Sequence, residues 1–185
     1  DAVRIRPHRL KSGTGTYFCD VARASAGPGS VVQWNDPRCW TRISPDLARQ
    51  TWDVPASAGK YAGTVKPGPM GTITAFSPSP KSRNVLWAGT DDGNVQMTAD
   101  GGLKWWNVTP HEIKPWTRIF NIEAGHFDAA TAYAAANTFR IDDLNPHFYR
   151  THDGGKSWQE INTGIAPGAV ANSIREDPRK KGLLY

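Results

Sequence analysis

The chain has 185 residues, 38% of them hydrophobic and 21% charged, and its 22 basic and 17 acidic side chains give a formal net charge of +5. This composition is globular, and no apolar run reaches the roughly 18 residues of a membrane-spanning helix. The basic excess is partly N-terminal, partly at Arg175–Lys181 and otherwise dispersed, which argues against a nucleic-acid partner. Abundant glycine (18), proline (14) and tryptophan (8) are typical of short strands joined by tight turns.

The first segment, residues 1–33, fits no strand or repeat pattern. It is either an irregular insertion or a corrupted stretch of sequence. Cys19 and Cys39 cannot form a four-ligand metal site alone, so they are either a disulfide or two thiols, and we expect no metal and no cofactor. Since the chain starts at Asp1 and stops in a strand-like run at Tyr185, we expect a piece of a longer protein.

Strand signals begin at Trp40–Ser44, which is expected to be the last strand of a preceding unit, and then recur in two sets of four. The first set is Thr72–Phe76, Val85–Thr90, Val95–Thr98 and Trp105–Val108. The second set is Arg118–Ala124, Thr131–Ala136, Phe148–Thr151 and Trp158–Ile161. A third set opens at Val170–Arg175. No segment has sustained helical periodicity, so we predict an all-β chain.

A phrase of the form T-x-D-G-G-x-x-W occurs twice, at Thr98–Trp105 and Thr151–Trp158, with its aspartates 53 positions apart. A damaged copy stands at Trp34–Trp40. A second repeated pattern consists of a turn, then a small or apolar pair, then an aromatic residue. Its three copies end at Trp87, Tyr133 and Tyr185. Four-stranded antiparallel units that repeat about every 50 residues indicate the blades of a β-propeller.

Each residue of the phrase has a mechanical reason to be there. Glycines permit backbone angles closed to other residues, and the aspartate can accept N–H groups that a tight turn leaves unpaired. The threonine hydroxyl can add a local bond, and the tryptophan can bury its indole against the blade interface. We therefore assign a structural role to Thr98, Asp100, Gly102, Trp105, Thr151, Asp153, Gly155 and Trp158.

This phrase resembles the Asp-box, or BNR repeat, of sialidases, xyloglucan-active glycoside hydrolases and sortilin-type receptors. Three further segments are most similar in sequence to sortilin-type propellers, especially bacterial ones labelled glycosyl hydrolase with BNR repeats. These segments are Trp40–Leu47, Leu86–Gly93 and Arg175–Pro178. The resemblance covers roughly Trp34–Tyr185. It implies that the Asp-box is a structural device on the face opposite the ligand. It also implies export to the periplasm or the exterior.

Blade geometry then directs the search for function to the loops on that opposite face. Its carboxylates are Glu112, Asp92, Asp142 and Asp143, of which the last three are the catalytic candidates. Two of them from different blades could supply the paired carboxyls that a glycosidase requires. Arg140, His147 and Glu112 are the candidate binding residues.

We therefore predict a partial β-propeller of four-stranded antiparallel blades with Asp-box turns. Its expected parts are a blade remnant at 34–70, blades at 71–109 and 116–162, and the start of another blade at 169–185. The favoured function is a sortilin-like scaffold that binds a peptide, a protein or a glycan and packs against the remaining blades of the full-length chain. The alternative is a xyloglucanase- or sialidase-like glycoside hydrolase acting on a polysaccharide.

Overall fold

The computed structural model describes residues 32–36, 39–50, 59–60, 63 and 71–185. Most of the segment 1–33, including Cys19, lies outside the described residues. The backbone of the damaged copy at Trp34–Trp40 is described in part, but its side chains, including that of Cys39, are not. Parts of the expected blade remnant, at 51–58, 61–62 and 64–70, are also outside.

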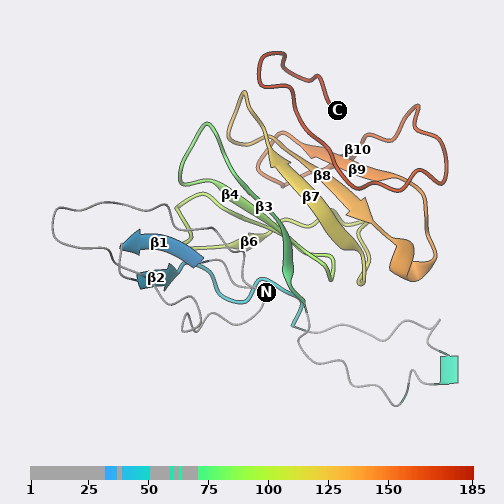
Figure 1. Cartoon of the computed structure of the whole chain (residues 1–185), viewed down its shortest axis with the longest axis horizontal. Coiled ribbons are helices and arrows are strands. Elements are labelled where there is room, and N and C mark those ends of the chain that lie inside the picture. The colour runs from blue at the N-terminus through green and yellow to red at the C-terminus, as the bar shows by residue number, and fades with distance from the viewer. Residues whose placement is uncertain (1–31, 37–38, 51–58, 61–62, 64–70) are drawn as a thin grey trace.

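The described chain forms three antiparallel sheets (Figure 1). A hairpin joins β1 (Val32–Asp36) to β2 (Cys39–Arg42). The first four-stranded sheet consists of β3 (Ile73–Pro78), β4 (Leu86–Thr90), β5 (Val95–Thr98) and β6 (Trp106–Asn107). The second consists of β7 (Arg118–Ala124), β8 (Ala132–Asn137), β9 (His147–Thr151) and β10 (Gln159–Glu160).

Both four-stranded sheets are meanders, because each strand pairs with the next one along the chain. They pack face to face as neighbouring propeller blades do, with β7 against β3 and β4. This arrangement confirms the predicted all-β class and the four-stranded antiparallel units. The outermost strands, β6 and β10, have only two residues each, which leaves little unpaired backbone at each outer edge.

The strand expected at Val170–Arg175 is not formed. Backbone bonds of 2.9 Å join Arg175 to Tyr185 in both directions and Asp177 to Leu183, so a hairpin begins only at Arg175. The N–H of Ile174 instead donates to the side chain of Asn121 on β7, at 2.9 Å. The prediction was wrong here because the apolar pattern at 170–174 serves packing against the second sheet rather than a strand ladder.

Three equivalent turns explain the repeated pattern that ends in an aromatic residue. The N–H groups of Ser79, Gly125 and Asp177 donate to the carbonyls of Val85, Thr131 and Leu183, at 2.8–2.9 Å. Each turn therefore places an aromatic residue two positions beyond its end. The first two turns are 46 positions apart, whereas the two aspartates of the phrase are 53 apart. The second repeat must therefore contain additional residues between its turn and its aspartate. In the structure these residues lie between β8 and β9.

That longer connection runs from Thr138 to Pro146 and contains a short 3-10 helix, η3 (Phe139–Ile141). The equivalent connection in the first sheet is the tight turn between β4 and β5. Asp142 ends η3 in the left-handed conformation, with φ of 59°. The β8–β9 connection is therefore the main difference between two otherwise similar sheets.

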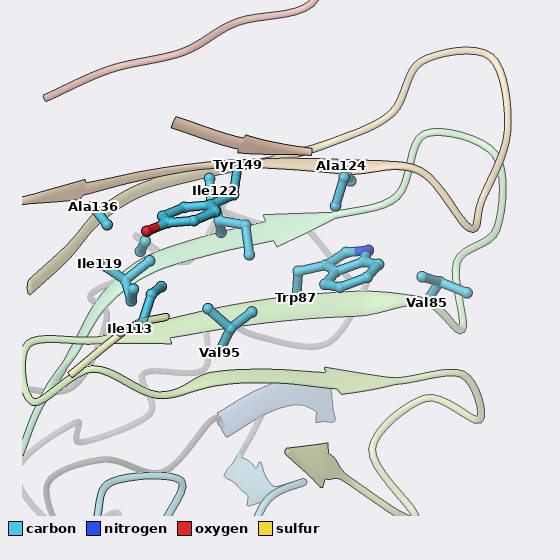
Figure 2. Close-up of a cluster of buried hydrophobic side chains, with 12 residues drawn as sticks. Val85, Trp87, Val95, Ile113, Ile119, Ile122, Ala124, Ala136 and Tyr149 are labelled. Carbon is cyan, nitrogen blue, oxygen red and sulfur yellow. The ribbon is translucent and has the colours of Figure 1, made fainter. Parts of the chain in front are cut away.

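The core lies between the two sheets (Figure 2). Trp87 of β4 is 0% exposed, and its ring meets that of Trp158 edge to face, with centroids 6.1 Å apart. Strand β8 has the sequence AYAAAN and is buried along its whole length. Its small alanines allow the first sheet to pack closely on one side of it and the C-terminal segment on the other. The far side carries a second cluster, in which Tyr133 packs with Ala171 and Ile174 of the C-terminal segment.

The two T-x-D-G-G-x-x-W turns are built alike. The Thr98 hydroxyl donates to Asp100 at 2.8 Å and accepts from the Gly102 N–H at 3.0 Å. Asp100 also accepts the N–H of Lys104 at 2.9 Å. The second copy repeats these bonds, and its aspartate accepts a further bond from a serine hydroxyl. The threonine and aspartate therefore satisfy the donors of a turn whose two glycines have positive φ.

Each phrase also attaches its sheet to the residue that follows the last strand of the preceding sheet. The indole N–H of Trp158 donates to the carbonyl of Val108 at 2.6 Å, and that of Trp105 donates to the carbonyl of Ile43 at 2.9 Å. Ile43, just after β2, therefore occupies the position that Val108 occupies after β6. The phrase thus links successive sheets as well as closing a turn.

Acid should weaken the turn at Asp153. Hydrogen bonds from Ser157 and Thr151 lower the pKa of Asp153 from 3.8 to about 2. A folded-state pKa below the unfolded value stabilises the fold above about pH 4, and this contribution is lost as the pH falls toward 2. We therefore expect Asp153→Asn to flatten the decline of the melting temperature between pH 4 and pH 2, measured by circular dichroism. An unchanged slope would contradict this role.

Candidate functional site

Antiparallel meanders place their connections alternately at two ends of each sheet, and these ends define two faces. We call one the motif face; it consists of the turns at 79–85, 99–105, 125–131, 152–158 and 177–183. We call the other the loop face; it consists of the connections at 43–50, 91–94, 108–117, 138–146 and 161–170. The catalytic and binding candidates from the sequence lie in these connections, except His147, which follows the connection at 138–146 as the first residue of β9.

Asp92 is buried and holds the backbone. It accepts the Thr90 hydroxyl at 2.5 Å with one carboxylate oxygen and the Arg49 N–H at 2.8 Å with the other. The Arg49 side chain returns this contact by donating to the Asp92 carbonyl at 2.7 Å. Both carboxylate oxygens are therefore engaged in fixing the β4–β5 turn to the segment before it.

Asp91 and Arg140 connect the loop-face connections of the two sheets. The Arg140 guanidinium donates to the Asp91 carbonyl at 2.9 Å and lies 3.3 Å from its carboxylate. Asp91 also accepts the N–H of Thr72 at 2.8 Å. The pair thus anchors the long β8–β9 connection on the first sheet. Arg140 was predicted as a binding residue. Its partner Asp91 was not a candidate, and the one signal for it in the sequence is its place beside Asp92 in the same turn.

His147 forms the second polar cluster of the loop face. Its Nε2 lies 2.8 Å from Asp143, and its Nδ1 lies 3.2 Å from Glu160. The backbone N–H of Asn145 and the nearby His147 hold the pKa of Asp143 below its usual value, against a smaller opposing effect of burial. Glu160 was missed by the sequence analysis because it lies 13 residues further along the chain, on β10.

The remaining two carboxylates, Asp142 and Glu112, are exposed. Asp142 ends η3, where its conformation shapes the connection. Glu112 lies in the link between the sheets, and its carboxylate is 3.2 Å from His111. Asp92, Glu112 and Asp143 therefore contact three different sets of partners, and of the candidates only Asp143 and His147 are seen in contact among the described residues.

The β8–β9 connection also presents two large apolar side chains. Phe139 is 49% exposed and Leu144 is 54% exposed, and they lie on either side of Asp142 and Asp143 in sequence. Exposed apolar groups beside charged ones are typical of a recognition surface. Neither of these two residues was among the candidates from the sequence.

Two of the predicted carboxylates, Asp92 and Asp143, are engaged by neighbouring groups of the chain. A glycosidase requires one carboxyl group with a raised pKa to act as the general acid. The pKa of Asp143 is lowered, and Asp92 is fully occupied by backbone and hydroxyl donors. These carboxylates are therefore placed to hold the loops in position.

A further carboxylate pair lies between the second sheet and the C-terminal hairpin. Glu123 contacts Arg175 at 2.6 Å and His126 at 3.1 Å. Glu176 is buried and accepts the Tyr133 hydroxyl at 2.9 Å and the His126 N–H at 2.6 Å. Burial beside this carboxylate raises the pKa of Tyr133. The saturation of Glu176 by donors indicates a structural connection between successive repeats.

Comparisons with known proteins find sequence similarity to two proteins named for vacuolar sorting. The chain is 30% identical over 127 residues to vacuolar protein sorting/targeting protein 10 of Laccaria bicolor, covering 63% of this chain and 8% of that protein. It is 29% identical over 126 residues to the protein of the same name from Chaetomium globosum, covering 64% and 7%. The chain thus spans less than a tenth of the length of these curated relatives. No protein-family profile matches it.

A search of solved structures finds one titled "YCF48 bound to D1 peptide", with 19% identity, a TM-score of 0.42, and coverage of 71% of this chain and 33% of that one. An overlap this loose carries no weight for function. Among the described residues, no helix is long and apolar enough to cross a membrane. The sequence similarity and the four-stranded sheets together support a relationship to sortilin-like β-propellers.

Proposed function

We propose that this chain is part of a propeller scaffold that binds a peptide or protein ligand on its loop face. The observation that carries this proposal is the long β8–β9 connection, which presents Phe139 and Leu144 while Arg140 fixes it to Asp91. A connection held at both sheets loses less conformational freedom on binding, which favours affinity. The names of the relatives, vacuolar protein sorting/targeting proteins, fit a role in protein recognition.

In this scheme the two apolar side chains anchor the ligand, and the charged groups beside them set its orientation. Buried aromatic and aliphatic anchors contribute most of the affinity in typical interfaces, while peripheral charges contribute specificity. Arg140 is the polar contact that we assign to the ligand, and His147 supports the connection through Asp143 and Glu160. The carboxylates Asp92, Asp142, Asp143 and Glu112 shape and support the loops.

We also propose the accompanying architecture and location. The two four-stranded sheets correspond to blades at 71–109 and 116–162, and the T-x-D-G-G-x-x-W turns act as Asp-box locks on the other face. As in sorting proteins, the route of the full-length protein is the secretory or export pathway. No observation favours the glycoside hydrolase alternative.

A peptide selection tests the binding function. Peptides would be selected from a random display library on the immobilised protein, and the affinity of the enriched peptides would then be measured by calorimetry. We expect the double variant Phe139→Ser, Leu144→Ser to weaken binding by at least about tenfold without changing the melting temperature, because two exposed anchors are removed.

The matched control is Leu103→Ser, which removes an exposed leucine from the motif face and should leave peptide affinity unchanged. Equal binding by the double variant would place the ligand elsewhere and overturn the proposal. A glycan panel tested in parallel distinguishes the enzyme: turnover that is lost in Asp143→Asn would support the hydrolase instead.

A further inference from the structure

The motif face carries an excess of positive charge. Its five turns contain seven basic side chains, all exposed: Lys81, Arg83, Lys104, Lys156, Arg179, Lys180 and Lys181. They contain four aspartates, which gives the turns a formal net charge of +3. Among the described residues, none of the seven basic groups forms an ion pair within 4 Å of a carboxylate. These cations therefore remain available to a partner.

The four aspartates of this face are directed into their own turns. Asp128 accepts the N–H groups of Ala130 and Thr131 at 2.9 and 2.8 Å, and Asp177 accepts those of Arg179 and Lys180 at 2.7 and 2.8 Å. The aspartates of the two phrases are bound in the same way. These bonds lower the pKa of all four carboxyls, so they stay ionised. Their oxygens are engaged, whereas the basic groups project into solvent.

The loop face has an excess of negative charge. The described stretches that define it, 43–50, 91–94, 108–117, 138–146 and 161–170, contain six acidic side chains, Asp46, Asp91, Asp92, Glu112, Asp142 and Asp143, against three basic ones, Arg49, Lys114 and Arg140. The two faces of the sheets thus differ in sign. A charged partner would be attracted to one face and repelled by the other, which would orient the molecule.

The motif face also carries apolar groups among its cations. Leu103 is 90% exposed at the tip of the first phrase. Next to it, the Lys104 ammonium lies 5.2 Å from the ring centroid of Trp106, which is itself 38% exposed. Leucine and tryptophan beside lysine are the residues that proteins insert at a lipid headgroup boundary.

We propose that the motif face docks onto an anionic lipid bilayer. The seven cations come from turns of three successive repeats that end on one face, so they can contact a surface of negative headgroups together. A nucleic acid or an acidic protein would use the same cations, but neither would require a fully exposed leucine at the tip. Docking in this orientation would direct the loop face away from the membrane. The inference does not depend on the proposed peptide function.

Vesicle co-sedimentation with the whole chain tests this surface. The probes are vesicles of phosphatidylcholine alone and vesicles with about one third phosphatidylserine. We expect binding only to the anionic vesicles, with a loss at raised salt because surface charges are screened. Arg179→Gln, Lys180→Gln, Lys181→Gln together should lower the partition coefficient by about 100-fold, at about fivefold for each charge removed.

Two matched pairs of variants make the result specific. Lys156→Gln should weaken vesicle binding by about fivefold, whereas Lys114→Gln, which removes an exposed charge from the loop face, should not change it. Leu103→Ser should weaken binding to vesicles but leave binding to a DNA duplex unchanged. Equal effects of the two lysine variants, binding to neutral vesicles, or binding to DNA but not to vesicles would each overturn the proposal.

Discussion

Replacing Trp87 by alanine is expected to lower the free energy of unfolding by about 3–5 kcal/mol, as typical of a large aromatic removed from a core. The side chain is 0% exposed and fills the space between the two four-stranded sheets, against Trp158. The neighbouring residues that could fill the cavity are short β8 alanines and Val95, whose positions are fixed by the strand ladders. The measurement is equilibrium unfolding in urea, with the midpoint and slope fitted separately.

Trp106→Ala is the matched control, since this tryptophan lies on the outer strand β6 and its ring contacts Lys104. We expect that variant to lose less than about 1 kcal/mol, because surface substitutions rarely cost more. Trp87 also has an indole N–H with no partner among the described residues. Trp87→Phe should therefore cost much less than the alanine variant. Equal losses for the two alanine variants would show that the sheets do not share one core.

Gly102→Ala is expected to destabilise the fold by about 2–4 kcal/mol, from an unfavourable backbone angle together with overpacking. Gly102 has φ of 100°, and a Cβ atom there would lie 2.5 Å from the carbonyl oxygen of Ile43. Because that oxygen belongs to the backbone and accepts the Trp105 indole, it cannot move without breaking the contact. The effect would be measured as the shift in the urea midpoint.

The preceding glycine supplies the control. Gly101 has φ of 75°, but a Cβ atom there would meet its nearest neighbour, Asn84, at an ordinary 3.7 Å. Gly101→Ala should therefore cost only about 1 kcal/mol, from the left-handed backbone alone. The difference between the two variants isolates the close approach of the turn to the preceding strand. Equal losses would show that this approach contributes nothing to stability.

Both predictions concern the contact between successive sheets, on which the loop face depends. Arg140, in the β8–β9 connection of the second four-stranded sheet, donates to Asp91, in the β4–β5 turn of the first. In the same way, Arg49, in the segment after β2, donates to Asp92 of that turn. The loops that we propose for ligand binding are therefore placed by the packing of sheets rather than by their own sequence. Variants that loosen the core should alter binding without touching a ligand contact.

The sequence alone determined the repeat, the strand class and the turn chemistry. Glycines of positive φ, an aspartate and a threonine at fixed spacing act locally, within eight residues, so the bonds of Thr98 and Asp100 follow from the order of residues. The period of the aromatic residues likewise placed Trp87 and Tyr133 in equivalent positions of successive repeats, and the structure shows that both are buried. Among the described residues, the strand signal at Val170–Arg175 was misleading, because 170–174 pack against the second sheet without pairing and the hairpin begins at Arg175.

Only the tertiary structure decided which loop residues meet. Asp91 and Arg140 are 49 positions apart, and Asp92 is 43 positions from Arg49, so no local pattern relates them. Burial of Asp92 and the exposure of Phe139 depend on how far each connection extends beyond the packed sheets. The phrase T-x-D-G-G-x-x-W thus specifies its turn by short-range hydrogen bonds, whereas the candidate site results from packing between repeats, which brings together side chains that the sequence keeps apart.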